Sequence, residues 1–353
     1  MNEKIRHLRE QMKRLNLEGM IVSNPISIRY LTNIQAEGTL LITRKENIFI
    51  TYAMYMEDVN STLTINDEVI VVDIKNISKD EFENFFLFCE NVGFEEGYVT
   101  YAEYKKIYQR YKVNNLVETE GIVEKQRIIK DNIEIENIKK ACEITDNCFS
   151  HLLTFIKKDM TEKQVANEIE RYFKENEADG LAFETVVAFG ENSSKPHWIP
   201  SDRKINSGEP ILIDMGCKYN GYCSDMTRTI FLGCILEEYK PYYDAVLKNE
   251  ILSLDQIKDG VVVKKATEII DENLKRNNIN LIHALGHGVG MEIHEAPIIH
   301  TNVESYFKEN MVIAIEPAVY FPSNYGIRIE DTVVVTKNGC IPLTKSDKNY
   351  IVI

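Results

Sequence analysis

The sequence predicts an α+β protein with a smaller N-terminal α/β domain and a larger C-terminal domain. At 353 residues the chain is long enough for two domains. Helical and strand-like segments alternate up to residue 120, where the polar run ETEGIVE separates them from the rest of the chain. After that run, a pair of helices followed by a pair of acid-bearing strands occurs twice. We therefore expect domains at residues 1–120 and 121–353.

The N-terminal domain is expected to open with an amphipathic helix. Its apolar residues recur at helical spacing, at Ile5, Leu8, Met12 and Leu15. The strand GMIVS follows. Further strands are expected at 40–43, 47–51 and 68–74, with helices near 80–90 and 101–111. Nothing in this domain has the spacing of metal ligands.

Two helices with capping boxes are expected to open the C-terminal domain. The boxes pair Asp131 with Glu134 and Thr161 with Gln164, and apolar residues at helical spacing follow each. Two further helices are expected at 242–258 and 262–276. This weak internal duplication, visible as architecture and not as identity, would place two carboxylate pairs facing each other across a pseudo-twofold axis.

The first acidic pair is Asp214 and Asp225, on two predicted strands joined by a short turn at 218–221. An ionised carboxylate inside an apolar strand is costly unless a cation or hydrogen-bond donors compensate for its lost hydration. In the alternative interpretation, Asp214 caps a turn and Asp225 is an exposed strand residue. The two residues alone do not decide between a metal site and ordinary turn chemistry.

Four of the seven histidines lie within residues 283–300, among glycines that allow close backbone approach. They are His283, His287, His294 and His300. A histidine cluster of this kind indicates a functional site more often than a set of core residues. The spacing of His283 and His287 resembles that of a zinc-protease helix, but Ala284 stands where that motif requires Glu, so we reject it.

The second acidic pair is Glu316, after an apolar run, and Glu330, flanked by β-branched residues. With the aspartates and one histidine, these residues form a donor set dominated by oxygen. Such sets suit Mn²⁺ or Co²⁺ better than do the Cys/His sets of structural zinc. Four carboxylates carry more negative charge than one divalent ion requires, so the sequence predicts two ions.

Composition excludes several classes of function. The net charge of −14 argues against a nucleic-acid surface. No apolar segment approaches the length of a membrane span, and the charged N-terminal helix is not expected to be a signal peptide. Seven cysteines without a CxxC motif favour free thiols and a cytoplasmic location.

The motifs PHWIPSD, IDMG, SDMTRT, GHGVG, IHEAP, IEPAVY and RIED, in this order, resemble those of the metallopeptidase family of prolidase and aminopeptidase P. The resemblance covers nearly the whole chain. It implies a "pita-bread" catalytic domain after an N-terminal domain of the creatinase/prolidase type. It also implies a pair of divalent ions, Mn²⁺ first with Co²⁺ or Zn²⁺ as alternatives, which would activate a shared water.

The resemblance assigns a metal-binding role to five residues. Asp214 would bind the first ion, His287 and Glu316 the second, and Asp225 and Glu330 both. Glu316 would also exchange a proton with the water.

The resemblance also assigns roles to three residues outside the five ligands. His294 would donate a hydrogen bond to the carbonyl oxygen or the developing oxyanion, and His197 would position the substrate and help to move a proton. Arg328 would orient carboxylates, or, in the alternative, form a surface ion pair.

The implied activity is cleavage of the bond before proline in short proline-containing peptides, by a homodimer. The Xaa-Pro dipeptidase is the first choice, and the alternative is an aminopeptidase P that acts on longer Xaa-Pro peptides. A metal-free binding protein is disfavoured because all five ligands are present.

Two other relatives with this fold match less well. Methionine aminopeptidase usually has no separate N-terminal domain of this length, and creatinase uses the fold without metals. Three departures from the family pattern, Cys217, Ala318 and Trp198, put substrate preference in doubt, and Trp198 could line a pocket or pack.

Overall fold

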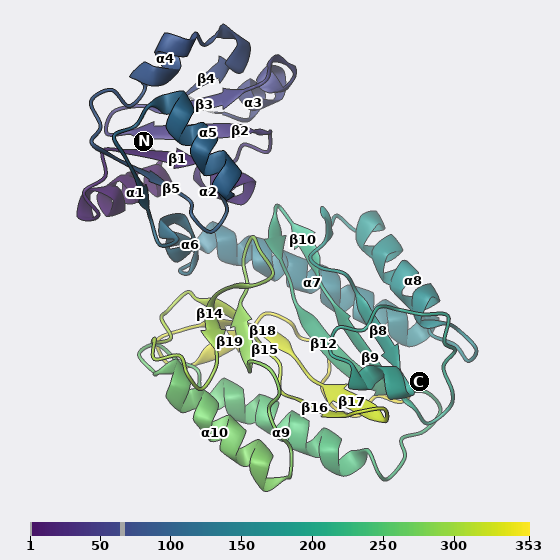
Figure 1. Cartoon of the computed structure of the whole chain (residues 1–353). Coiled ribbons are helices and arrows are strands. Elements are labelled where there is room, and N and C mark those ends of the chain that lie inside the picture. The colour runs from purple at the N-terminus through teal and green to yellow at the C-terminus, as the bar shows by residue number, and fades with distance from the viewer. Residues whose placement is uncertain (1, 64–67) are drawn as a thin grey trace. The chain divides into compact units, whose positions relative to one another are not determined.

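The computed structural model describes residues 2–63 and 68–353, which fall into two compact units, Met1–Arg127 and Ile128–Ile353. Each unit contains helices and strands (Figure 1), which confirms the α+β class. Helix α6 (Ile122–Arg127) belongs to the first unit, where Gln126 Nε2 donates a hydrogen bond to Lys4 O at 2.9 Å. The unit boundary thus follows α6, whereas the polar run placed the expected domain boundary before it.

The N-terminal unit contains a mixed six-stranded sheet in the order β4-β3-β2-β1-β5-β6. The β1–β2 and β2–β3 pairs are antiparallel, and the other three pairs are parallel. The strands are β1 (Gly19–Val22), β2 (Gly38–Thr43), β3 (Asn47–Thr51), β4 (Val69–Asp73), β5 (Asn91–Phe94) and β6 (Asn115–Glu118). The helices besides α6 are α1 (Glu3–Arg14), α2 (Pro25–Thr32), α3 (Met56–Thr62), α4 (Lys79–Asn84) and α5 (Tyr101–Tyr111).

Helix α1 buries Ile5, Leu8 and Met12, as its periodicity predicts. Leu15 does not belong to the buried face, because the helix ends at Arg14 and the side chain is 49% exposed. The helix expected at 80–90 is also shorter than predicted, since the chain leaves helical geometry for turns after Asn84.

Two pairs of helices flank the strands of the C-terminal unit (Figure 1). They are α7 (Asn132–Phe155) with α8 (Glu162–Glu175), and α9 (Lys240–Gln256) with α10 (Val263–Arg276). Both predicted capping boxes are present: the Asp131 and Thr161 side chains accept hydrogen bonds from the backbone N–H of Glu134 and Gln164, respectively. Among the described residues, no helix combines the length and the apolar character needed to cross a bilayer.

The strands of the C-terminal unit form small sheets, of which two carry the acidic pairs. One has the order β12-β9-β8 and the other β14-β13-β15-β18-β19, while β11-β10-β7 and β16-β17 are smaller. The bounds are β7 (Gly180–Leu181), β8 (Val186–Phe189), β9 (Pro210–Met215), β10 (Cys217–Tyr219), β11 (Tyr222–Cys223), β12 (Met226–Phe231), β13 (Gly286–Gly288), β14 (Glu295–Ile299), β15 (Val312–Ile315), β16 (Ala318–Phe321), β17 (Tyr325–Arg328), β18 (Asp331–Val335) and β19 (Cys340–Pro342).

The expected hairpin between Asp214 and Asp225 is more complex than predicted. Strands β9 and β12 do pair antiparallel, with Asp214 opposite Thr227, but the turn at 218–221 joins β10 to β11 in a different sheet. The chain changes sheets at Gly216, where an added Cβ would lie 2.0 Å from Ser224 O. Only glycine allows this approach of two backbone segments.

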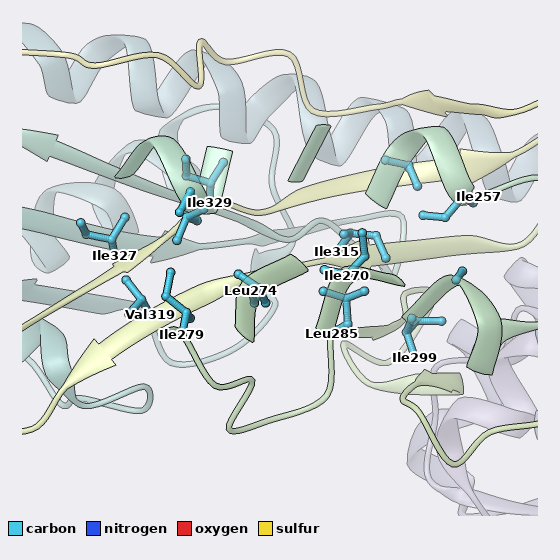
Figure 2. Packing of buried hydrophobic residues seen from close by; sticks show 14 of the residues in the cluster. Ile257, Ile270, Leu274, Ile279, Leu285, Ile299, Ile315, Val319, Ile327 and Ile329 are labelled. Carbon is cyan, nitrogen blue, oxygen red and sulfur yellow. The ribbon is translucent and has the colours of Figure 1, made fainter. Parts of the chain in front are cut away.

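Each helix pair packs on its own set of strands through a separate apolar cluster. Figure 2 shows residues of one cluster, which includes Ile270 and Leu274 of α10, Ile315 of β15 and Ile327 of β17. The second cluster joins α7 and α8 to β8, β9 and β12. These two clusters fix the sheets, and therefore the strand ends that carry the acidic residues.

Glu95 is a buried carboxylate of the N-terminal unit whose effect on stability should depend on pH. Its side chain accepts hydrogen bonds from the N–H groups of Ser23 and Asn24 at 2.7 and 2.8 Å, and burial raises its pKa from 4.5 to about 7. The folded state therefore binds the proton more tightly than the unfolded state does. We expect this contribution to be complete below pH 4.5 and to be lost as the pH rises through 7, by about 3 kcal/mol.

The measurement is the free energy of unfolding across that pH range for the wild type and for Glu95→Gln. The difference between the two proteins should change with pH, because glutamine does not titrate. A pH-independent difference would contradict the prediction.

Candidate functional site

All eight residues to which the motifs assign a role line one cleft of roughly 1140 Å³ in the C-terminal unit. The acidic residues lie at or near strand ends and not in strand centres. Asp214 is the fifth residue of β9, Asp225 directly precedes β12, and Glu316 directly follows β15. Glu330 lies between β17 and β18. His287 is the central residue of the short strand β13.

Asp225, His287 and Glu330 converge most closely: one potential ligand atom from each lies within 4.8 Å of the others. His287 Nε2 is 3.4 Å from Asp225 Oδ2 and 3.9 Å from Glu316 Oε1. Asp214 Oδ2 contacts Arg328 Nη2 at 2.5 Å. The structure thus gathers three of the four predicted carboxylate ligands around the imidazole, while an arginine holds the fourth, Asp214, in the same cleft.

The imidazole of His287 is presented to the carboxylates in a defined tautomer. Its Nδ1 lies 3.1 Å from Gly288 O, and because a carbonyl oxygen only accepts, Nδ1 carries the proton and leaves Nε2 free. Burial lowers the pKa of His287 to about 4, so the ring is neutral near pH 7. Glycines on both sides of His287 allow neighbouring strands to approach: a Cβ at Gly286 would lie 1.9 Å from Ala314 O, and one at Gly288 2.3 Å from Ala296 O.

Two threonines connect the acidic residues reciprocally. Thr227, two residues after Asp225, donates its hydroxyl to Glu330 Oε2 at 2.6 Å. Thr332, two residues after Glu330, donates its hydroxyl to Asp225 O at 2.8 Å. Neither was predicted from the sequence, although each stands at the same offset from a predicted ligand, in SDMT and IEDT. The repeated offset is a trace of the internal duplication.

Arg328 is buried, with 2% of its surface exposed, so the surface ion-pair interpretation is wrong. Its Nη2 donates to Asp214, its Nη1 to Tyr320 Oη at 2.6 Å, and its Nε to Thr227 Oγ1 at 3.0 Å. The guanidinium therefore holds one predicted ligand directly and, through Thr227, a second one, Glu330. Tyr320, in IEPAVY, was not singled out from the sequence.

The carboxylates of the site destabilise one another. Burial raises the pKa of Asp225 and Glu330 well above their ordinary values, and neighbouring carboxylates raise both further. Burial also raises the pKa of Glu316 to about 7 and that of Asp214, where Arg328 partly offsets the effect.

Asp331 is next to Glu330 in the chain, but its pKa is lowered and not raised. Burial alone would raise its pKa, but Arg228 and Lys348 hold it below the ordinary value. Arg228 Nη2 contacts Asp331 Oδ1 at 2.7 Å, and Lys348 contacts Oδ2. Of two adjacent buried acids, one is neutralised by protein cations and the other, Glu330, faces the cleft among other acids.

The residues present fit a divalent-metal centre. Asp214 Oδ1 is buried without a hydrogen-bond partner in the described structure. Four carboxylates and one neutral imidazole form an oxygen-rich donor set that hard divalent ions prefer. Cations among these side chains would relieve the repulsion that raises the pKa values of Asp225 and Glu330.

Three histidines outside the five predicted ligands line the same cleft. The ring of His294 meets that of His287 edge to face, with centroids 4.4 Å apart. His197 and His283 also line the cleft, whereas His300 does not and instead contacts Asn302. Burial lowers the pKa of His294 and His283. These rings offer neutral N–H donors next to the carboxylates.

The chain matches two protein-family models. Residues 136–337 match metallopeptidase family M24, and residues 4–129 match the creatinase/prolidase N-terminal domain. An uncharacterised peptidase of Bacillus subtilis is 33% identical over 355 residues, which span 99% of this chain and 100% of the relative.

Solved structures resemble this chain over nearly its whole length. An Xaa-Pro dipeptidase from Bacillus anthracis has 32% identity and a TM-score of 0.94, with 99% of each chain covered. An X-Pro aminopeptidase from Thermotoga maritima has 28% identity and a TM-score of 0.89, with 98% of this chain and 100% of that one covered.

Metal binding should be visible in thermal unfolding. We expect millimolar Mn²⁺ to raise the melting temperature of the metal-free wild type by about 5–10 °C, the effect of a ligand at roughly a hundred times its Kd. In Asp225→Asn the amide removes one repelling charge but also a ligand. The metal-free variant should be at least as stable as the metal-free wild type, and Mn²⁺ should hardly shift it. A full metal-induced shift in this variant would exclude Asp225 as a ligand.

Proposed function

Because this chain belongs to metallopeptidase family M24 and carries a creatinase/prolidase N-terminal domain, we propose that it is a dinuclear-metal hydrolase that cleaves the peptide bond before proline in Xaa-Pro dipeptides. The observation that carries the proposal is the convergence of Asp225, His287 and Glu330 within 4.8 Å in a cleft lined by further histidines. The likeness to a solved Xaa-Pro dipeptidase supports the choice of substrate.

The proposed ligands divide between two ions. Asp214 would help to hold the first ion, His287 and Glu316 would help to hold the second, and Asp225 and Glu330 would complete the ligand set. Mn²⁺ is the proposed metal, with Co²⁺ or Zn²⁺ as alternatives. When bound, the ions supply Lewis-acid activation of a water molecule and of the scissile carbonyl. The free Nε2 of His287 and the oxygen-rich set around it support this assignment.

The remaining chemistry belongs to side chains of the chain itself. Glu316 accepts a proton from the attacking water and returns it to the leaving amine, a task that a carboxylate beside the reacting water can perform. His294 donates a hydrogen bond to the oxyanion that develops on the substrate carbonyl. His197 positions the substrate from another segment of the cleft lining and helps to move a proton. Arg328 keeps Asp214 oriented through the contact at 2.5 Å.

One observation favours the second candidate, an aminopeptidase P that releases the N-terminal residue of longer Xaa-Pro peptides. A dipeptidase must bind a free C-terminal carboxylate close to the scissile bond. Among the described residues that line the cleft, Arg328 is the one arginine or lysine, and Asp214, Tyr320 and Thr227 already occupy its guanidinium. A longer peptide would not require a cation at this place. The expected homodimer stays a prediction.

Substrate length decides between the two candidates. The purified protein is assayed on Xaa-Pro dipeptides and on matched Xaa-Pro-Yaa tripeptides, first with Mn²⁺ and then with Co²⁺. We expect a higher kcat/KM for the dipeptide. A preference for the tripeptide would identify an aminopeptidase P. A protein that binds no metal and cleaves neither peptide would contradict the enzyme proposal itself.

His294→Ala is predicted to lower kcat by about 100- to 1000-fold, the usual effect of losing one donor to a developing oxyanion. Because His294 is not among the proposed ligands, the metal content should remain that of the wild type. Asp225→Asn serves as the comparison, since it should abolish hydrolysis together with metal binding while the fold is retained. Loss of metal from His294→Ala would instead make that residue a ligand.

A further inference from the structure

Glu162, the first residue of α8, is a fully buried carboxylate that the proposed reaction does not use. Its Oε1 accepts hydrogen bonds from Phe189 N at 2.8 Å and from Asn192 Nδ2 at 3.0 Å. Its Oε2 accepts from Trp198 Nε1 at 2.8 Å, from Ser201 N at 2.9 Å and from Ser201 Oγ at 2.6 Å. Five hydrogen bonds converge on this one carboxylate, so it fixes its donors in place.

The donors belong to one segment, residues 189–201, which runs from the end of β8 through the 3₁₀ helix η3 (Gly190–Ser194). The same segment carries His197, Trp198 and Ile199, all of which line the cleft. A further hydrogen bond holds η3 in place: Ser193 Oγ accepts from Gly326 N at 2.8 Å. Residues 189–201 therefore form a fixed part of the cleft lining, with Glu162 behind it.

Trp198 is held by several contacts within this segment. Beyond the indole hydrogen bond to Glu162, its ring packs against the buried cluster Val186, Ala188 and Leu212. Lys195 Nζ lies over the ring at 4.0 Å from the centroid, a favourable cation–π distance. The neighbouring Ile199 is 81% exposed and extends the apolar surface into the cleft.

We propose that Trp198 determines substrate specificity by packing against an apolar side chain of the residue before proline, and that Glu162 is the positioning residue that holds the indole in place. The proposal rests on the proposed function and names the substrate class within it. Proline is common to all substrates, so selectivity arises at the variable residue. A rigid indole beside Ile199 offers that residue an apolar surface and no partner for a charge.

The first test compares Leu-Pro with Gly-Pro as substrates of the Mn²⁺-loaded protein. In Trp198→Ala we expect KM for Leu-Pro to rise about tenfold or more, while kcat and the values for Gly-Pro change by less than about twofold. Trp198→Phe keeps an apolar ring but loses the donor to Glu162, so its selectivity should lie between those of the wild type and Trp198→Ala. An unchanged ratio of kcat/KM in a folded Trp198→Ala, or an equal rise in KM for both peptides, would overturn the proposal.

The second test follows the indole itself, because Trp198 is the only tryptophan of the chain. In Glu162→Gln, the side-chain NH₂ group replaces an oxygen that accepts hydrogen bonds, and an NH₂ group cannot accept them. The indole of Trp198 should therefore be held less tightly and become more mobile. We expect its emission to shift to the red, its quenching by acrylamide to increase, and selectivity for Leu-Pro to fall. Glu168→Gln is the matched control on the same helix: that carboxylate contacts Arg171 and His151, and its loss should leave emission and selectivity unchanged. Unaltered emission and selectivity in Glu162→Gln would remove its positioning role.

Binding and hydrolysis are separable in this design. A wild type whose Trp198 fluorescence responds to Leu-Pro, but not to Gly-Pro, and which cleaves neither peptide would contradict the proposed function and support the role of Trp198. A wild type that cleaves both peptides while its fluorescence ignores Leu-Pro would contradict the role of Trp198 and support the proposed function.

Discussion

Repulsion among buried carboxylates is the constraint on which the C-terminal unit depends. Asp214, Asp225, Glu316 and Glu330 face one cleft, and Arg328 is the single guanidinium among its described lining residues. The contrast with Asp331 shows that the fold can neutralise a buried acid when it needs to, since Arg228 and Lys348 both contact that residue. Of the four cleft acids, only Asp214 forms an ion pair with an arginine or lysine in the described structure, through Arg328. Their arrangement is therefore costly unless cations from solution complete it.

The four repelling carboxylates stay close together only if the surrounding sheets and helices do not move apart. The two apolar clusters fix the helix pairs on their sheets, and the sheets present the acids at strand ends. The hydroxyls of Thr227 and Thr332 then join the two halves directly across the site. Thr227 donates to the Glu330 carboxylate, and Thr332 donates to the backbone carbonyl of Asp225. Displacement of either sheet would therefore disturb both acidic pairs. This frame of sheets and helices resists the repulsion that the site creates.

Much of this could be predicted from the sequence, because the signals are local. The capping boxes at Asp131 and Thr161 and the family-like motifs around each acid depend on short spacings. The features that could not be predicted depend on contacts between distant segments. The change of sheet at Gly216 requires Ser224 to approach it, and the neutralisation of Asp331 requires knowledge of where Arg228 and Lys348 lie.

The two glycines around His287 allow adjacent strands to lie against its backbone, because any side chain at position 286 or 288 would collide with the carbonyl of an adjacent strand. Attempts to re-engineer the metal preference of this protein therefore gain nothing from libraries at these positions. Variation has to enter from the carboxylate side, where Glu316 follows its strand and is not enclosed by it. Of the proposed ligands, His287 is the fixed reference point and Glu316 is the one open to adjustment.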